Sequence, residues 1–172
     1  MTIEGFNHTV DLWIKELGNY DLAELRFQPA PGSWSLGQVC FHLVKNTNYY
    51  IEQINICCAT NDHMTEVAFP EGIAMLRNNE FPDSIIEGPD TDVALPQPET
   101  KEELLSELLL VKTQMNNVAA LIRATDFKGK TKHPGLGYFD ACDWLQFSEM
   151  HFRHHLRQKK RIDEMLRAAR QK

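Results

Sequence analysis

The amino-acid sequence predicts an all-α fold, an up-down-down-up four-helix bundle with a long crossover between the second and third helices. Three observations support this prediction. Four segments carry apolar residues at the three- and four-residue spacing of amphipathic helices, and no segment alternates strongly enough to predict a sheet. About forty proline-interrupted residues separate the two middle segments, and so long a connection suits middle helices that run parallel.

The first two helices show clear apolar stripes. In residues 3–17 the stripe is formed by Ile3, Phe6, Val10, Trp13, Ile14 and Leu17. Ser35 and Gln38 form an S-x-x-Q capping box, which predicts the start of the second helix. Its stripe continues to Cys57 or Cys58, and a loop containing proline and glycine joins it to the first helix.

The last two helices follow the long connection. Residues 60–99 contain one candidate helical turn, near Gly72 to Arg77, and we expect the segment to form a lid or a partner interface. Thr100 and Glu103 form a second capping box before a leucine-rich stripe that ends near Ile122. Asp140, after a turn-rich connection, is a plausible N-cap for the final helix.

Composition limits the class of protein. With 172 residues, 42% of them hydrophobic, the chain is expected to form a single globular domain over residues 1–172. Its net charge of -6 and its single dense basic run argue against nucleic-acid binding. No secretory signal or membrane-spanning run is seen, so we expect a cytoplasmic protein without a membrane partner. The four cysteines contain no C-x-x-C pair and are expected to be small buried hydrophobes.

Three histidines occur within "EMHFRHHLRQ", residues 149–158 of the final helix. His151 and His155, at i and i+4, lie on the stripe that also contains Trp144 and Ile162, so both face the bundle interior and can reach one ion. His154 lies about 100 degrees around the helix and is expected to be a bystander. Taken alone, this spacing is weak evidence for a metal, and it fits better two polar residues at the mouth of a bundle, bonded to water.

His42 strengthens the metal hypothesis because it lies beside core positions of the second helix. Three imidazole nitrogens with an open coordination position are typical of catalytic divalent-metal sites. Asn46 and Gln158, on or near the same helix faces, are predicted to orient the imidazoles or a substrate, although they also fit ordinary polar residues. The remaining histidines are expected to be non-ligands, but His133 leads into the final helix and is a candidate for lining a pocket.

Other chemistries fit the sequence less well. No glutamate stands three residues before a histidine, as a di-iron carboxylate bundle requires. No C-x-x-C-H haem motif is present, and no strand-turn-helix elbow surrounds a serine. No carboxylate lies on the ligand face of the final helix, because Glu149 is about 160 degrees from His151. No catalytic residue is assigned from the sequence.

Two segments resemble the DinB-like superfamily, particularly its YfiT-like branch of metal-dependent hydrolases and thiol S-transferases. They are "PAPGSWSLGQVCFHLVKNTNYY" (29–50) and "HPGLGYFDACDWLQFSEMHFRHHLRQKKRI" (133–162), and residues 60–99 contain no matching motif. The resemblance implies an up-down-down-up bundle that binds zinc, nickel or another divalent ion. Its three histidine ligands correspond here to His42, His151 and His155.

The resemblance also implies an activity. Relatives include transferases and isomerases that use a low-molecular-weight thiol such as bacillithiol or mycothiol, so we expect a thiol S-transferase or a related hydrolase acting on a small-molecule substrate. The alternative is a metal- or ligand-binding bundle without turnover. A homodimer is one expected form of assembly.

Overall fold

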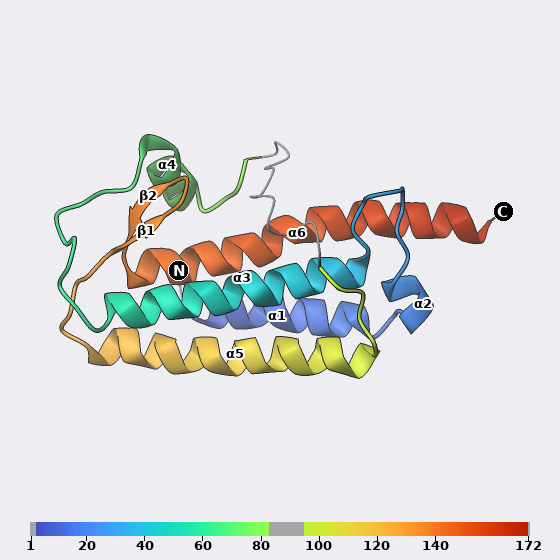
Figure 1. The fold of residues 1–172 in the computed structure, drawn as a ribbon, viewed down its shortest axis with the longest axis horizontal. Coiled ribbons are helices and arrows are strands. Elements are labelled where there is room, and N and C mark those ends of the chain that lie inside the picture. The colour runs from blue at the N-terminus through green and yellow to red at the C-terminus, as the bar shows by residue number, and fades with distance from the viewer. Residues whose placement is uncertain (1–2, 83–94, 172) are drawn as a thin grey trace.

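The computed structural model describes residues 3–82 and 95–171, which form mostly helices and one small antiparallel sheet. Four long helices make the body of the molecule, and a short helix and the hairpin lie beside it (Figure 1). The elements are α1 (Ile3–Leu17), α2 (Leu22–Leu25), α3 (Leu36–Cys57), α4 (Pro70–Asn78), α5 (Lys101–Ala124), β1 (Thr131–His133), β2 (Gly137–Phe139) and α6 (Ala141–Arg170). The chain therefore has the predicted all-α class.

Side-chain contacts show the relative direction of the first and last helices, α1 and α6. The Trp13 indole donates to the Phe152 carbonyl at 3.1 Å, and the Tyr20 hydroxyl donates to Asp163 at 2.5 Å. Because both residue numbers rise together, α1 and α6 are parallel. Figure 1 shows α3 and α5 running in the opposite direction, which is the up-down-down-up order.

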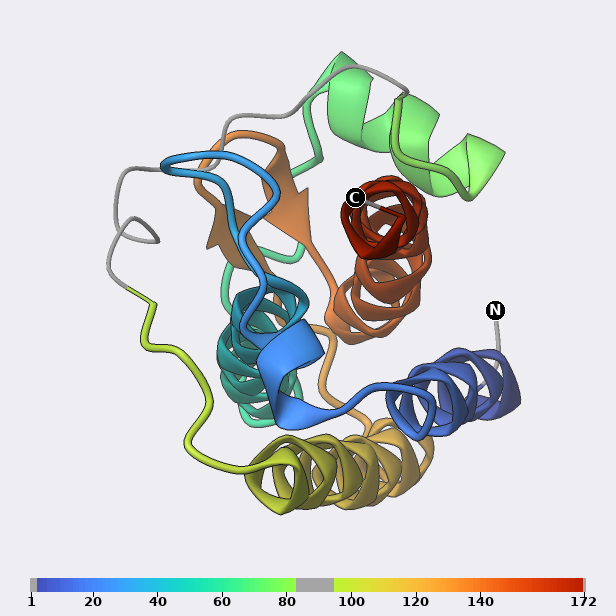
Figure 2. The same cartoon turned by 90° about the vertical axis from the view of Figure 1, so that its right-hand side faces the viewer.

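The four long helices surround one apolar core. Seen along the bundle, α1 and α3 lie on opposite sides, with α5 and α6 each beside both (Figure 2). Cys40, Cys57 and Cys58 are buried, as expected, but Cys142 is exposed because it lies on the outer side of the first turn of α6. Fully buried core residues include Phe6, Val10, Trp13, Leu17, Val39, Leu43, Ile54, Leu104, Leu108, Val111, Met115, Trp144 and Phe152.

Local caps begin the two helices that contain the candidate ligands. Ser35 accepts from the N–H of Gln38, whose side chain accepts in return from the N–H of Ser35. Asp140 begins α6 with an equivalent reciprocal pair. The expected capping box at Thr100 is only half formed, because the Glu103 carboxylate accepts from the N–H of Glu99, one residue earlier.

The sheet was not predicted from the sequence. Strands β1 and β2 have only three residues each, too few for a period-two pattern to be recognised. Gly137 has φ +83°, and a Cβ there would lie 2.6 Å from the backbone nitrogen of Phe69. Glycine is thus needed both for its conformation and for the close approach of the neighbouring chain.

The long connection lies against α6 and the start of α3. The candidate turn near residues 72–77 is part of α4, and Arg153 of α6 donates to the Asn79 carbonyl just beyond it at 2.7 Å. At the far end, Gln38 donates to the Leu95 carbonyl at 2.7 Å. Of the segment expected to be a lid or partner interface, residues 83–94 lie outside the described residues.

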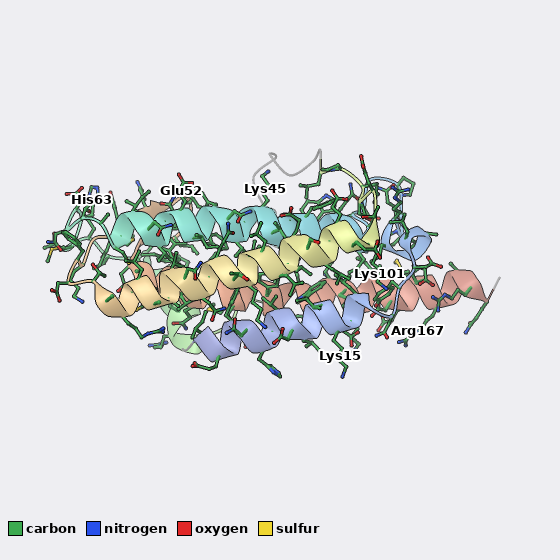
Figure 3. All side chains as sticks on the ribbon, turned by 90° about the horizontal axis from the view of Figure 1, so that it is seen from below. Lys15, Lys45, Glu52, His63, Lys101 and Arg167 are labelled. Carbon is green, nitrogen blue, oxygen red and sulfur yellow. The ribbon has the colours of Figure 1, made fainter. Side chains whose placement is uncertain are left out.

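Charged side chains cover the outside of the bundle. Lys15, Lys45 and Glu52 are exposed, and Figure 3 shows them on the outer faces of α1 and α3. Among the described helices, none has a stretch both long and apolar enough to cross a bilayer.

Replacing Gly137 with alanine should destabilise the fold by about 1–3 kcal/mol, because alanine is strained at positive φ and its methyl group would contact the Ala68–Phe69 backbone. Urea denaturation of the purified variant measures this loss. Gly135→Ala is the matched control in the same hairpin, because no atom lies within 4 Å of the position that a Cβ would occupy there. Equal losses in both variants would contradict this role for Gly137.

Candidate metal centre

Three histidines meet where α3 faces α6. His42 lies in the second turn of α3, beside the buried residues Val39 and Leu43. His151 and His155 lie one turn apart on the inward face of α6. Because the two helices run antiparallel and pack along their length, the second turn of α3 lies opposite the middle of α6 (Figure 1).

The three side chains point their Nε2 atoms at one another. Nε2 of His151 lies 3.1 Å from Nε2 of His42 and 3.0 Å from Nε2 of His155. One nitrogen from each ring lies within 4.8 Å of the other two, so the group could hold a metal ion. The rings are 7–8% exposed, which makes this a nearly dry site.

The outer nitrogens of the three rings have different partners. Nδ1 of His155 lies 2.8 Å from Oε1 of Gln158. Nδ1 of His42 lies 3.2 Å from Nδ2 of Asn46, which also donates to the His42 carbonyl at 2.9 Å. Nδ1 of His151 is buried without a hydrogen-bond partner among the residues that the structure describes. The two polar residues predicted to orient the imidazoles therefore do contact them.

With the amide nitrogen of Asn46 facing Nδ1 of His42, three neutral imidazoles cannot all satisfy one another. Each carries one N–H. Gln158 accepts that of His155 at Nδ1, which leaves a lone pair on Nε2, whereas the Asn46 amide nitrogen at Nδ1 of His42 leaves the proton on Nε2. If Nε2 of His151 carries a lone pair, it faces the lone pair on Nε2 of His155. If it carries a proton, that proton faces the proton on Nε2 of His42.

A shared cation would satisfy all three rings at once, because it takes a lone pair from every Nε2. For His42 the proton would then be on Nδ1, and Asn46, whose amide nitrogen also donates to the His42 carbonyl at 2.9 Å, would have to reorient to accept it. The donor set therefore fits a divalent ion of the kind that imidazole binds.

Burial keeps the two histidines of α6 neutral. It lowers the pKa of His151 well below the usual value, and the neighbouring imidazoles lower it further. Burial likewise lowers the pKa of His155 to about 3, although its hydrogen bond to Gln158 acts in the opposite direction. Near neutral pH neither ring carries a proton on both nitrogens, so each has a lone pair available.

Aromatic rings surround the histidines. The Trp34 ring lies 4.9 Å from that of His42, between centroids, and the Tyr50 ring lies 5.9 Å from that of His151. Phe81, from the long connection, lies 5.9 Å from His151 and packs against His154 at 5.1 Å. Sequence reasoning missed Phe81, because no motif in the long connection indicates where its side chains pack.

His154 lies outside the three-histidine group. It is half-buried under Phe81 rather than turned to solvent, and its Nδ1 is buried without a partner among the described residues. His8 is exposed on α1, and His63 lies in a turn beside Tyr138. His133, which leads into α6, ends β1 and packs beside that helix.

Carboxylates are absent from the group among the described residues. Glu149, the buried carboxylate nearest in sequence, accepts from Thr9 at 3.0 Å and from Arg153 at 2.9 Å. These partners tie it to the contact between α1 and α6. The site is thus an all-nitrogen donor set in an aromatic surrounding.

His133 should make the folded protein sensitive to acid. Burial lowers its pKa to about 4, so between about pH 6.5 and pH 4 the unfolded chain binds a proton there that the folded chain does not. Stability is then complete above pH 6.5 and falls as the pH falls through this window. As the pH falls from 6.5 to 4, the unfolding free energy of His133→Phe should decline less steeply than that of the wild type, by up to about 1.4 kcal/mol per pH unit.

Urea denaturation from pH 7 to pH 4.5 checks this difference. His8→Gln, which removes an exposed histidine, is the control and should follow the wild type. Parallel pH profiles for His133→Phe and the wild type would contradict the assignment.

A comparison with known proteins agrees with this architecture. The family model described as the DinB superfamily matches residues 6–158, which include most of α1, all of α3 and α5, and all three converging histidines. No curated protein and no solved structure matches the chain significantly. A match over most of the chain is sufficient to assign the family, and the protein is a member of the DinB superfamily.

Proposed function

We propose that the protein is a metal-dependent enzyme whose divalent ion, zinc or nickel, is bound by His42, His151 and His155. The observation that carries this proposal is the convergence of three buried Nε2 atoms, with contacts of 3.0 and 3.1 Å. Three imidazole ligands leave a coordination position for a substrate, whereas structural zinc sites are usually closed by four protein ligands.

Two polar residues would prepare the ligands. Gln158 accepts the N–H of His155 and so directs the lone pair of Nε2 toward the centre of the group. Asn46 lies 3.2 Å from Nδ1 of His42 and donates to the His42 carbonyl, so it would restrict the orientation of the His42 ring. Such hydrogen bonds fix the ring orientation and raise the basicity of a histidine ligand.

The reaction we propose is S-transfer from a low-molecular-weight thiol to a small electrophilic substrate, or a related hydrolysis. A divalent ion in this site would supply Lewis acidity and lower the pKa of a thiol or of water. Hydrolysis also calls for a general base, and the described residues place no carboxylate in the group. This favours the thiol, which needs no further base once it is ionised.

A second candidate is a metal- or ligand-binding bundle without turnover. The low exposure of the three rings favours it, because substrate has to reach a site that is 7–8% exposed. The cytoplasmic location, the single-domain organisation and the homodimer stay predictions from the sequence.

His151→Ala should lose the metal. Removing the central of the three ligands should weaken zinc or nickel affinity by more than about 100-fold, since loss of even an outer partner costs up to that much. Elemental analysis of untagged protein, followed by chelator competition, measures this. His154→Phe is the matched control, because it removes the neighbouring imidazole and keeps a ring against Phe81. Equal metal content in wild type and His151→Ala would contradict the site.

The metal-loaded wild type should conjugate chlorodinitrobenzene to bacillithiol or mycothiol, and His151→Ala should fall to the uncatalysed rate. Absorbance of the thioether product measures this, with an ester and an amide substrate assayed in parallel. Cleavage of the ester or amide alone would assign a hydrolase instead. If the metal-loaded protein turns over neither the thiol and chlorodinitrobenzene nor the ester and amide substrates, the metal- or ligand-binding bundle without turnover is favoured.

A further inference from the structure

His133 occupies a defined position beside the candidate metal centre. The hairpin that ends in His133 is tied to α6 by the Trp144 indole, which donates to the Thr131 hydroxyl at 2.7 Å. The His133 ring then packs on two rings of α6, at 5.5 Å from Trp144 and 5.0 Å from Phe147. Its place is therefore determined by the hairpin and by an aromatic surface.

The proton of His133 is also placed. The backbone N–H of Gly135 donates to Nδ1 of His133 at 3.1 Å, so the neutral ring carries its own hydrogen on Nε2. Burial favours this neutral form. The Nε2–H of His133 has no acceptor among the residues that the structure describes. Nε2 is also absent from the fully buried atoms without a partner, so this donor is accessible.

One aromatic surface, formed by rings that are each at most 7% exposed, connects His133 with the three histidines. Phe147 and His151 are one turn apart on α6, and two further rings each contact both of them. Tyr50 lies 5.4 Å from Phe147 and 5.9 Å from His151, and Phe81 lies 4.9 and 5.9 Å from the same two rings.

We propose that His133 is a substrate-binding residue whose Nε2–H donates a hydrogen bond to an acceptor oxygen of the substrate. The substrate class would be small planar apolar or aromatic molecules, with the reacting group at His42, His151 and His155 and a carbonyl, nitro or carboxylate oxygen further along the aromatic surface. This inference rests on the proposed metal site. It adds a specificity determinant that neither the three ligands nor their orienting residues provide.

The hydrogen bond can be separated from simple packing. His133→Phe keeps a ring against Trp144 and Phe147 but removes the donor, whereas His133→Gln restores an N–H donor. Benzohydroxamate is a suitable probe, because hydroxamates chelate a divalent ion and place a planar ring beside it. Its 3-nitro and 4-nitro derivatives add an acceptor oxygen at two positions on that ring.

Calorimetric titration of the zinc-loaded protein measures the affinity ratio between each nitro derivative and the parent compound. The nitro group changes chelation equally in every variant, so this effect cancels when the affinity ratio of a variant is compared with that of the wild type. For at least one isomer, His133→Phe should lower the ratio about three- to tenfold, the usual strength of one hydrogen bond. His133→Gln should recover most of the lost ratio. The affinity for benzohydroxamate itself should be unchanged in both variants, and this result also shows that they fold correctly.

Two outcomes would overturn the inference. If neither ratio changes in His133→Phe while parent affinity is retained, His133 does not bind the acceptor, and the metal site itself stands. If parent affinity falls with both ratios unchanged, the role of His133 is structural. A wild type that carries no zinc and does not bind benzohydroxamate would contradict the proposed function, a result that metal analysis tells apart from both.

Discussion

The burial of three imidazoles between α3 and α6 is the constraint on which the rest of the site depends. A polar group left without a partner in a protein interior costs about 1–3 kcal/mol, and this cluster contains the buried Nδ1 of His151 without a described partner. The apolar core on the α1 and α5 side offsets that cost. A bound cation would turn the same arrangement into a stabilising one, because binding to the folded state alone adds to its stability.

Rigid helices hold the ligands in place. Reciprocal caps at Ser35 and Asp140 begin the two helices, and the packing of their buried faces brings the histidines of both helices together. His151 and His155 are kept one turn apart by helix geometry, while His42 depends on how α3 packs against α6. The distances from His42 to His151 and to His155 are therefore set by the packing of α3 against α6.

Polar residues on the outer side of α6 control what covers the site. Arg153 donates to the Asn79 carbonyl and Arg157 to the Phe81 carbonyl at 3.2 Å, and these bonds hold Phe81 over His151 and His154. The hairpin, which packs beside α4, brings His133 to the same aromatic surface. Glu149, although buried, belongs to the α1 contact, which leaves the candidate centre with nitrogen donors and rings.

The sequence by itself determined the four long helices and two of their caps, because helical periodicity and capping depend on residues three or four positions apart. It also determined the candidate triad, since His151 and His155 share a helix face and His42 lies on an apolar stripe. Only the tertiary structure decided the three-residue strands, the half-formed cap at Thr100, and the approach of Phe81 and His133. These depend on contacts between residues tens of positions apart, such as Arg153 with Asn79, and no local pattern encodes which distant partner a side chain will meet.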